Sequence, residues 1–119
     1  MSDDVIFYSM PGPSVVQDED VRALSAALAE LVPGSRASAK IAIDCSQTHY
    51  VSSRVLGLLV SFCTDITDAG GRVVLYGVTP ATERVLNVTR LSTLLTVVEN
   101  EEEARNRLAH DEVGRLPRR

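Results

Sequence analysis

The sequence predicts a single α/β domain with a mostly parallel sheet of four to five strands and about four helices. The chain has 119 residues, which suits one compact domain. Short, uninterrupted apolar runs alternate along it with longer segments whose apolar residues recur every three or four positions. This alternation is typical of parallel strands joined by helical connections, because strands that are buried on both faces have continuous apolar sequences.

The first third of the chain is predicted to form two strands and a helix. Residues 5–9 are rich in strand-forming side chains, and the Pro-Gly-Pro at 11–13 ends this strand. Residues 14–16 are expected to be a short second strand. The helix that follows has acidic residues at 18–20, which suit its positive end, and it stops at the Pro-Gly of 33–34. Its apolar face is expected to contain Val21, Leu24, Ala27, Leu28, Leu31 and Val32.

A buried strand and a polar loop come next. Residues 41–43 are a short apolar strand that ends at Asp44, and we expect this aspartate to order the loop after it. The loop continues through residues 45–49. Residues 50–51 are expected to form one more extended piece before the second helix.

The second helix is predicted to open at Ser52 and Ser53 and to stop at residues 68–71. Gly57 lies inside it, where glycine usually costs helix stability, and we expect it to permit close packing against the sheet. The buried face is expected to contain Leu56, Leu59, Val60, Cys63 and Ile66.

The last third contains two more strands and two more helices in our prediction. Residues 73–76 form a strand that Gly77 ends, and Thr79 and Pro80 are strong signals for the start of a third helix. Residues 94–98 are predicted to be the last strand, and the acidic residues 99–103 begin the fourth helix. The buried sides are expected to contain Val85, Leu86 and Val88 in the third helix and Leu108 in the fourth.

Composition and charge argue against several classes of function. Acidic side chains outnumber basic ones by 16 to 12, and the net charge of −4 disfavours a nucleic-acid-binding surface. No apolar run approaches the roughly 18 residues that a membrane span needs, and residues 1–4 lack the pattern of a signal peptide. We therefore expect a cytoplasmic protein with one domain over residues 1–113 and a flexible tail over residues 114–119. The oligomeric state stays open.

The sequence also indicates no cofactor. It lacks the glycine-rich patterns of dinucleotide and nucleotide folds and the G-x-S-x-G of a hydrolase elbow. Cys45 and Cys63 are expected to be buried free thiols, although one disulfide is formally open. With His49 they offer too few ligands for a metal site.

Two enzymatic interpretations compete with that of a binding module. A phosphoaspartate receiver would use Asp44, but the further acidic groups that hold Mg²⁺ would have to come directly after the first strand, and none does. A small hydrolase could pair His49 with Ser52 or Ser53; a histidine in a turn is the favoured interpretation. We therefore predict that the protein is not an enzyme.

The segment from Asp44 to Leu59 resembles the signature of STAS domains, which runs roughly D-L-S-x-V-x-F-[IL]-[DS]-S-[SA]-[GA]-L-G-x-L. The residues that match it directly are Asp44, Ser46, Ser53, Leu56, Gly57 and Leu59. The run at 69–75 looks like the A-G-G-x-[LV]-x-L of the family, and Thr79 with Pro80 resembles the start of its next helix. The likeness covers about residues 5–108.

This resemblance implies a function. In the anti-sigma-factor antagonists of the family, a serine at the position of Ser53 is phosphorylated by the anti-sigma factor, which is itself a serine kinase. The unmodified antagonist binds this kinase, and the phosphorylated form is released. Ser53 is thus the implied phosphorylation site, with Ser52 as the alternative, and Ser52, Ser53, Arg54 and Thr79 are the implied partner contacts.

The sequence departs from this pattern beside the serine. Many family members have aspartate where this chain has Ser52, and Arg54 and Val55 replace small residues. These departures concern kinase recognition more than the fold. The alternative function is a STAS subunit that is never phosphorylated and acts by protein contacts in a transporter or a sensory complex.

Elementary chemistry is compatible with a switch at the two serines. A helix N-terminus favours anions because its first N–H groups are unpaired and its dipole is positive there. A phosphate on Ser53 would add about −1.5 to −2 charge without requiring the domain to refold. Capping of the helix is the simpler role for either serine. Arg54 is either a steering charge for an acidic partner or nucleotide phosphate, or an exposed arginine without a role.

Overall fold

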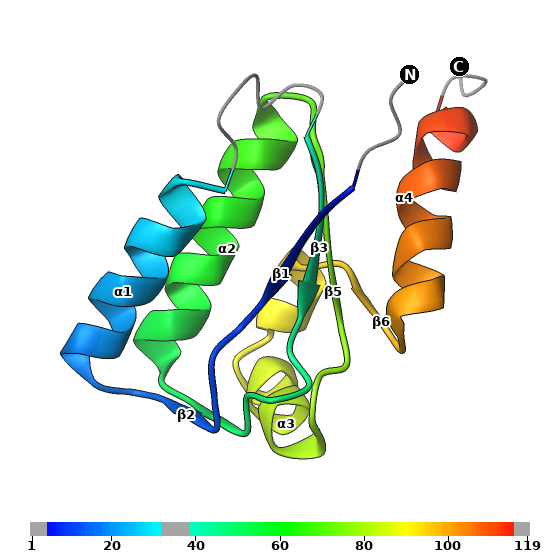
Figure 1. Ribbon diagram of the computed structural model, residues 1–119. Helices are drawn as coiled ribbons and strands as arrows, with labels where there is room; N and C mark the ends of the chain where they lie inside the picture. The colour runs from blue at the N-terminus through cyan, green and yellow to red at the C-terminus, as the bar shows by residue number, and fades with distance from the viewer. Residues whose placement is uncertain (1–4, 32–38, 116–119) are drawn as a thin grey trace.

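A four-stranded parallel sheet with the spatial order β1-β3-β5-β6 lies at the centre of the protein (Figure 1). The computed structural model describes residues 5–31 and 39–115. The strands of this sheet are β1 (Ile6–Ser9), β3 (Lys40–Asp44), β5 (Arg72–Tyr76) and β6 (Val97–Val98). All of their pairings are parallel because helical segments connect them, which confirms the predicted fold class.

Helices cover both faces of this sheet. α1 (Asp18–Ala29) and α2 (Ser53–Asp68) lie side by side on one face, and α4 (Glu101–Arg115) packs on the other (Figure 1). α3 (Pro80–Val88) lies beside the end of the sheet where the strands finish. The described residues thus form four α-helices, as the sequence predicts.

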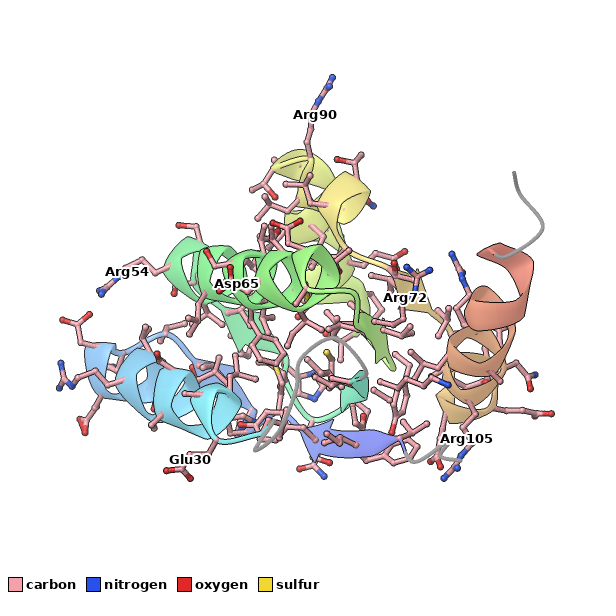
Figure 2. The ribbon with its side chains drawn as sticks, turned by 90° about the horizontal axis from the view of Figure 1, so that it is seen from above. Glu30, Arg54, Asp65, Arg72, Arg90 and Arg105 are labelled. Atoms are coloured by element: carbon pink, nitrogen blue, oxygen red, sulfur yellow. The ribbon has the colours of Figure 1, made fainter. Side chains whose placement is uncertain are left out.

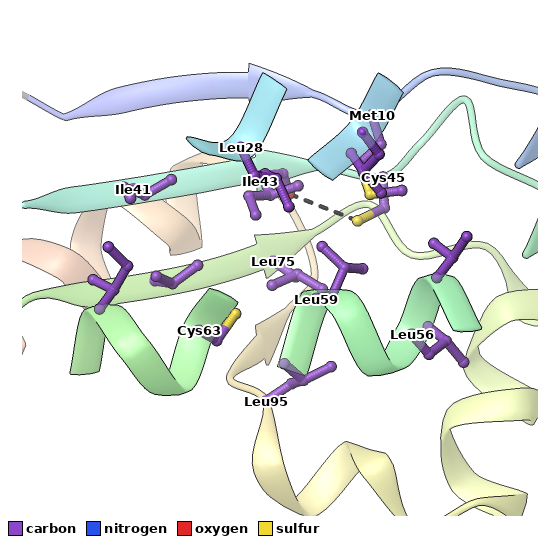
Figure 3. Packing of buried hydrophobic residues seen from close by; sticks show 14 of the residues in the cluster. Met10, Leu28, Ile41, Ile43, Cys45, Leu56, Leu59, Cys63, Leu75 and Leu95 are labelled. Carbon is purple, nitrogen blue, oxygen red and sulfur yellow. Dashed lines mark hydrogen bonds between the residues drawn. The ribbon is translucent and has the colours of Figure 1, made fainter. Parts of the chain in front are cut away.

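The alternation of side chains along the strands divides the core in two. Ile41, Ile43 and Leu75 face α1 and α2 in the larger cluster, with Leu28, Leu56 and Leu59 among their neighbours (Figure 3). Ala42 and Val74 face the other way, where Ala104 and Leu108 of α4 cover them. Consecutive residues of a strand point to opposite faces, so a strand covered on both sides must be apolar throughout.

A second, two-stranded sheet forms outside the main one. β2 (Ser14–Val15) pairs in parallel with β4 (Tyr50–Val51), with Val15 opposite Val51. The two extended pieces that the sequence predicts are both present, and they pair with each other rather than extend the central sheet. This pairing fixes the chain directly before α2 and therefore positions the two serines.

The last strand is shorter than predicted. The sequence predicts a strand over residues 94–98, but only β6 pairs with the sheet, and the 3-10 helix η2 (Leu91–Leu94) occupies the start of that range. Arg90 begins this turn in the left-handed conformation, with φ of 66°. Leu94 is 59% exposed, so this leucine belongs to a surface turn and not to a buried strand.

α3 begins as predicted, but the prediction of its buried side was partly wrong. Leu86 is buried and Val85 is half-buried, whereas Val88 is 77% exposed. Residues two positions apart on a helix do not share a face, so Val88 points away from the side on which Leu86 is buried.

Two helix ends differ from the expected ones. α1 ends at Ala29, earlier than its apolar pattern suggests; Val32 and the predicted stop at 33–34 lie outside the described residues. α4 continues to Arg115 and so includes the first two residues of the segment predicted to be a tail. The rest of that segment, residues 116–119, lies outside the described part of the chain.

Both cysteines are buried free thiols, as predicted. Burial raises the pKa of the Cys63 thiol to about 12. Burial, with smaller contributions from Asp44 and Cys63, raises the pKa of the Cys45 thiol to about 12 as well. The Cys45 thiol lies 3.9 Å from the Ile43 carbonyl oxygen, to which it donates a weak hydrogen bond (Figure 3).

We expect both thiols to react with an alkylating reagent at pH 8 about a thousandfold more slowly in the folded protein than in urea, because the thiolate is the reactive form. Folded thiols titrate near 12 and unfolded ones near 9.0, so the free energy of unfolding should fall as pH rises from 9 towards 12. Labelling followed by mass spectrometry measures the rates. Rapid labelling of either cysteine in the native protein would contradict the burial of that side chain.

Candidate functional site

Ser52 is the N-cap of α2 and is held by the protein itself. Its hydroxyl oxygen accepts a hydrogen bond from the Val55 N–H at 3.3 Å. Its own N–H donates to the Val15 carbonyl of β2 at 3.2 Å. The side chain is half-buried. Ser52 therefore performs the capping role, which is worth about 1 kcal/mol at such a position.

Ser53 is exposed and is the first residue of α2. Within the described residues its hydroxyl makes no hydrogen bond, in contrast to that of Ser52. The first turn of α2 also contains no acidic side chain, whereas α1 and α4 each have three there. The positive end of the α2 dipole is thus not compensated by carboxylates on its own first turn, and Ser53 lies at that end.

Arg54 reaches back from α2 to the start of α1. Its guanidinium forms an ion pair with the Asp18 carboxylate. The two side chains are 66% and 68% exposed, so solvent screens this pair and it contributes little to stability. Figure 2 shows Arg54 projecting from the end of α2 that carries the serines. In this pair the charge of Arg54, the residue after Ser53, is balanced by the Asp18 carboxylate.

Thr48, in the loop before β4, links the loop after β1 to the start of α3. Its side chain is buried, and its hydroxyl donates to the Pro11 carbonyl at 2.6 Å. Its own carbonyl accepts hydrogen bonds from the hydroxyls of Thr79 and Thr82, at 3.2 and 3.4 Å. Sequence reasoning missed Thr48, because a threonine within a polar loop has no pattern that distinguishes a buried residue from an exposed one.

Thr79 caps α3, as its position before Pro80 predicts. Its hydroxyl oxygen accepts from the Thr82 N–H at 3.4 Å and lies 3.2 Å from the Thr82 hydroxyl. The side chain is half-buried, and its polar group is engaged inside the protein. The role of Thr79 as a partner contact stays a prediction.

The loop before the serines is tied to the loop after β1. The N–H groups of His49 and Tyr50 both donate to the Pro13 carbonyl, at 2.8 and 3.0 Å. At the start of this loop, the Asp44 carboxylate accepts from the Ser46 N–H at 2.9 Å, which confirms that Asp44 orders it. Both loops are therefore rigidly joined below Ser52.

His49 and Tyr50, directly before Val51 and the two serines, both have exposed side chains. Tyr50 is a surface aromatic, 64% exposed, three residues before Ser53. His49 is exposed as well. Within the described residues, no hydrogen bond joins the His49 ring to Ser52 or Ser53.

The expected role of Gly57 was wrong. Gly57 is exposed, and a Cβ added to it would meet no atom within 4 Å. It therefore lies on the outer side of α2 and does not permit close packing against the sheet. Val55, which the pattern did not include in the buried face, is fully buried instead.

Neither a membrane span nor a metal centre is found in the described part of the chain. None of its helices combines the length and the apolar character that crossing a bilayer requires. Over the same residues, His, Cys, Asp and Glu side chains nowhere gather in threes with a geometry that could hold a metal ion.

Known families and structures resemble this chain over most of its length. The family model described as "Mlab, STAS domain" matches residues 14–98. No curated protein matches the sequence. A crystal structure of a candidate anti-sigma factor antagonist from Thermotoga maritima, TM1081, superposes with a TM-score of 0.76 at 22% identity, and covers 92% of this chain and 91% of that one.

A second solved structure has the same architecture. An anti-sigma-factor antagonist (STAS) domain protein from Planctomyces limnophilus superposes with a TM-score of 0.72 at 22% identity, and covers 85% of this chain and 87% of the other. At such identities, these superpositions establish a shared fold.

Proposed function

Since this chain belongs to the STAS domain family, we propose that it is an anti-sigma-factor antagonist, a module that binds an anti-sigma factor serine kinase and is released when Ser53 is phosphorylated. It acts in the cytoplasm and regulates transcription through protein contacts. The partner surface comprises Ser52, Ser53 and Arg54 at the start of α2, with Thr79 at the start of α3.

The difference between the two serines carries this proposal. The Ser52 hydroxyl is engaged as a helix cap, whereas the Ser53 hydroxyl is exposed and makes no hydrogen bond in the described protein. A kinase must place the acceptor oxygen in line with the transferred phosphoryl group. An approach to the exposed Ser53 leaves the cap of α2 intact, whereas an approach to the Ser52 oxygen would compete with its hydrogen bond from the Val55 N–H.

The first turn of α2 favours a reversible switch. A phosphate on Ser53 would lie at a helix N-terminus whose first turn has no carboxylate. Arg54, now paired with Asp18, is the adjacent cation that could turn to such a phosphate. The domain would therefore stay folded after modification. The phosphate would change the charge and shape of the surface to which the kinase binds.

Incubation with an anti-sigma-type serine kinase and ATP should add one phosphate to the chain. The intact mass should show this addition for the wild type and for Ser52→Ala, and should not show it for Ser53→Ala. Because Ser52→Ala removes a cap worth about 1 kcal/mol, its circular dichroism should be recorded to establish that it is folded. Phosphate that persists on Ser53→Ala and disappears from Ser52→Ala would refute the assignment.

A second candidate function has its own support in the sequence. Where many family members have aspartate, this chain has Ser52, and Arg54 replaces a small residue beside Ser53. Both changes concern recognition by a kinase. A STAS subunit of a transporter or sensory complex needs the same exposed corner but no phosphorylation. A chain whose mass never changes with any such kinase, yet which binds a complex through this corner, would support that function.

A further inference from the structure

Gly57 has no function that the folded chain itself explains. It is the fifth residue of α2, a helix of 16 residues, and glycine is the poorest helix former apart from proline. Gly12 and Gly77, in contrast, are each explained by the fold. A Cβ on Gly12 would strike the Gln47 backbone, and Gly77 has a φ of 71°. Around Gly57, by contrast, the structure leaves open space.

The position of Gly57 ties it to Ser53. Residues four apart on a helix lie on the same face, with about 5–6 Å between their Cβ positions. A kinase that phosphorylates Ser53 must bring its active site into contact with that residue, and an ordinary interface covers about 800 Å² of each partner. Its footprint therefore extends over Gly57. The next exposed position on this face, four residues further, is Ser61, another small residue.

From this we infer that Gly57 is a contact residue of the docking surface, at which the kinase approaches the α2 backbone through the space that a side chain would fill. The inference rests on the proposed function, because it commits to the same kinase as the occupant. The glycine weakens the helix of the free protein and allows a closer fit in the complex. Exposed Tyr50, three residues before Ser53, adds the kind of aromatic side chain that is enriched at such contacts.

The first test concerns the free protein and needs no partner. Gly57→Ala should raise the melting temperature by about 2–5 °C, since alanine is the better helix former and its methyl group meets open space. A lower melting temperature would show that Gly57 serves the fold. The inference would then be overturned whatever the kinase does.

The second test measures the affinity of the kinase, recombinant and loaded with ADP, for folded variants of the chain. Gly57→Leu should weaken binding about tenfold or more and Gly57→Ala less, because the added atoms occupy the contact. Thr67→Leu is the matched control: Thr67 is exposed and lies on the same helix about 15 Å beyond Gly57, so this variant should bind like the wild type.

These measurements distinguish a failure of the proposed function from a failure of the Gly57 contact alone. If the wild type is phosphorylated on Ser53 and Gly57→Leu binds as tightly as the wild type, the proposed function stands and this inference fails. If Gly57→Leu and Thr67→Leu lower the affinity for the kinase equally, the loss comes from added apolar surface in general, and the inference fails too. If no anti-sigma-type kinase binds or modifies the wild type, the proposed function fails and the inference fails with it.

Discussion

Replacing Gly12 with alanine is expected to lower the free energy of unfolding by about 3 kcal/mol. A Cβ at this position would lie 1.7 Å from the carbonyl oxygen of Gln47 and 2.6 Å from its carbonyl carbon. Both atoms are backbone, so no side chain can turn aside. The loop after β1 and the loop before β4 would have to separate.

This separation would also break the contacts that hold the candidate site. The same two loops are joined by the hydrogen bond from the Thr48 hydroxyl to the Pro11 carbonyl and by that from the His49 N–H to the Pro13 carbonyl. Gly12→Ala should therefore disturb the chain that leads into Ser52. Urea unfolding followed by circular dichroism measures the loss of stability.

Gly57→Ala is the matched control for this prediction, because it makes the same chemical change where the added methyl group meets no atom within 4 Å. It should be stabilising while Gly12→Ala is destabilising. A loss of less than about 1 kcal/mol in Gly12→Ala would mean that the two loops can move apart easily. The close approach would then not be what fixes the corner below Ser52.

The elements of the fold were predictable because they depend on local patterns. β3 and β5 each contain an uninterrupted apolar run, and the buried residues of α2 other than Val55 recur at the predicted helical spacing, so their burial follows from the sequence. The capping residues Ser52 and Thr79 were predictable for the same reason, since each directly precedes the helix that it caps.

Features that depend on how distant segments meet were not predictable in this way. Thr48 is buried only because the loop after β1 and the start of α3 close over it. The ion pair of Arg54 with Asp18 joins residues on two helices that are adjacent only in the folded protein. Gly57 was expected on the packed side of α2, but it is exposed. A glycine in a helix can permit close packing or lie on an open surface, and only the folded structure distinguishes the two.

The site itself illustrates both kinds of inference. Its position at the start of α2 follows from the sequence, and so does the presence of two hydroxyl groups there. Which hydroxyl is available follows only from the structure, in which β2 and β4 pair and thereby fix Ser52 through the Val15 carbonyl. Ser53, one residue later, is left exposed by that arrangement.

Phosphorylation of Ser53 is expected to weaken binding to the kinase about a hundredfold, a loss of about 3 kcal/mol. Two effects add. The phosphate places bulk at the centre of the proposed contact. It also adds a charge of about −1.5 to −2, which loses its hydration when the kinase binds, at a cost in binding free energy. Isothermal titration of phosphorylated and unmodified chain with ADP-loaded kinase measures the difference.

The stability of the phosphorylated domain distinguishes a surface switch from unfolding. A phosphate at the first residue of α2 lies at the positive end of the helix dipole, beside Arg54, so the melting temperature should be unchanged or slightly raised. Thr67→Glu, with its negative charge at the far end of the same helix, is the control and should bind within about twofold of the wild type. If the phosphorylated chain bound as tightly as this control, Ser53 would not be at the contact. If it melted several degrees lower, release would follow from loss of the fold, and the corner that β2, β4 and α2 hold in place would not be the switch.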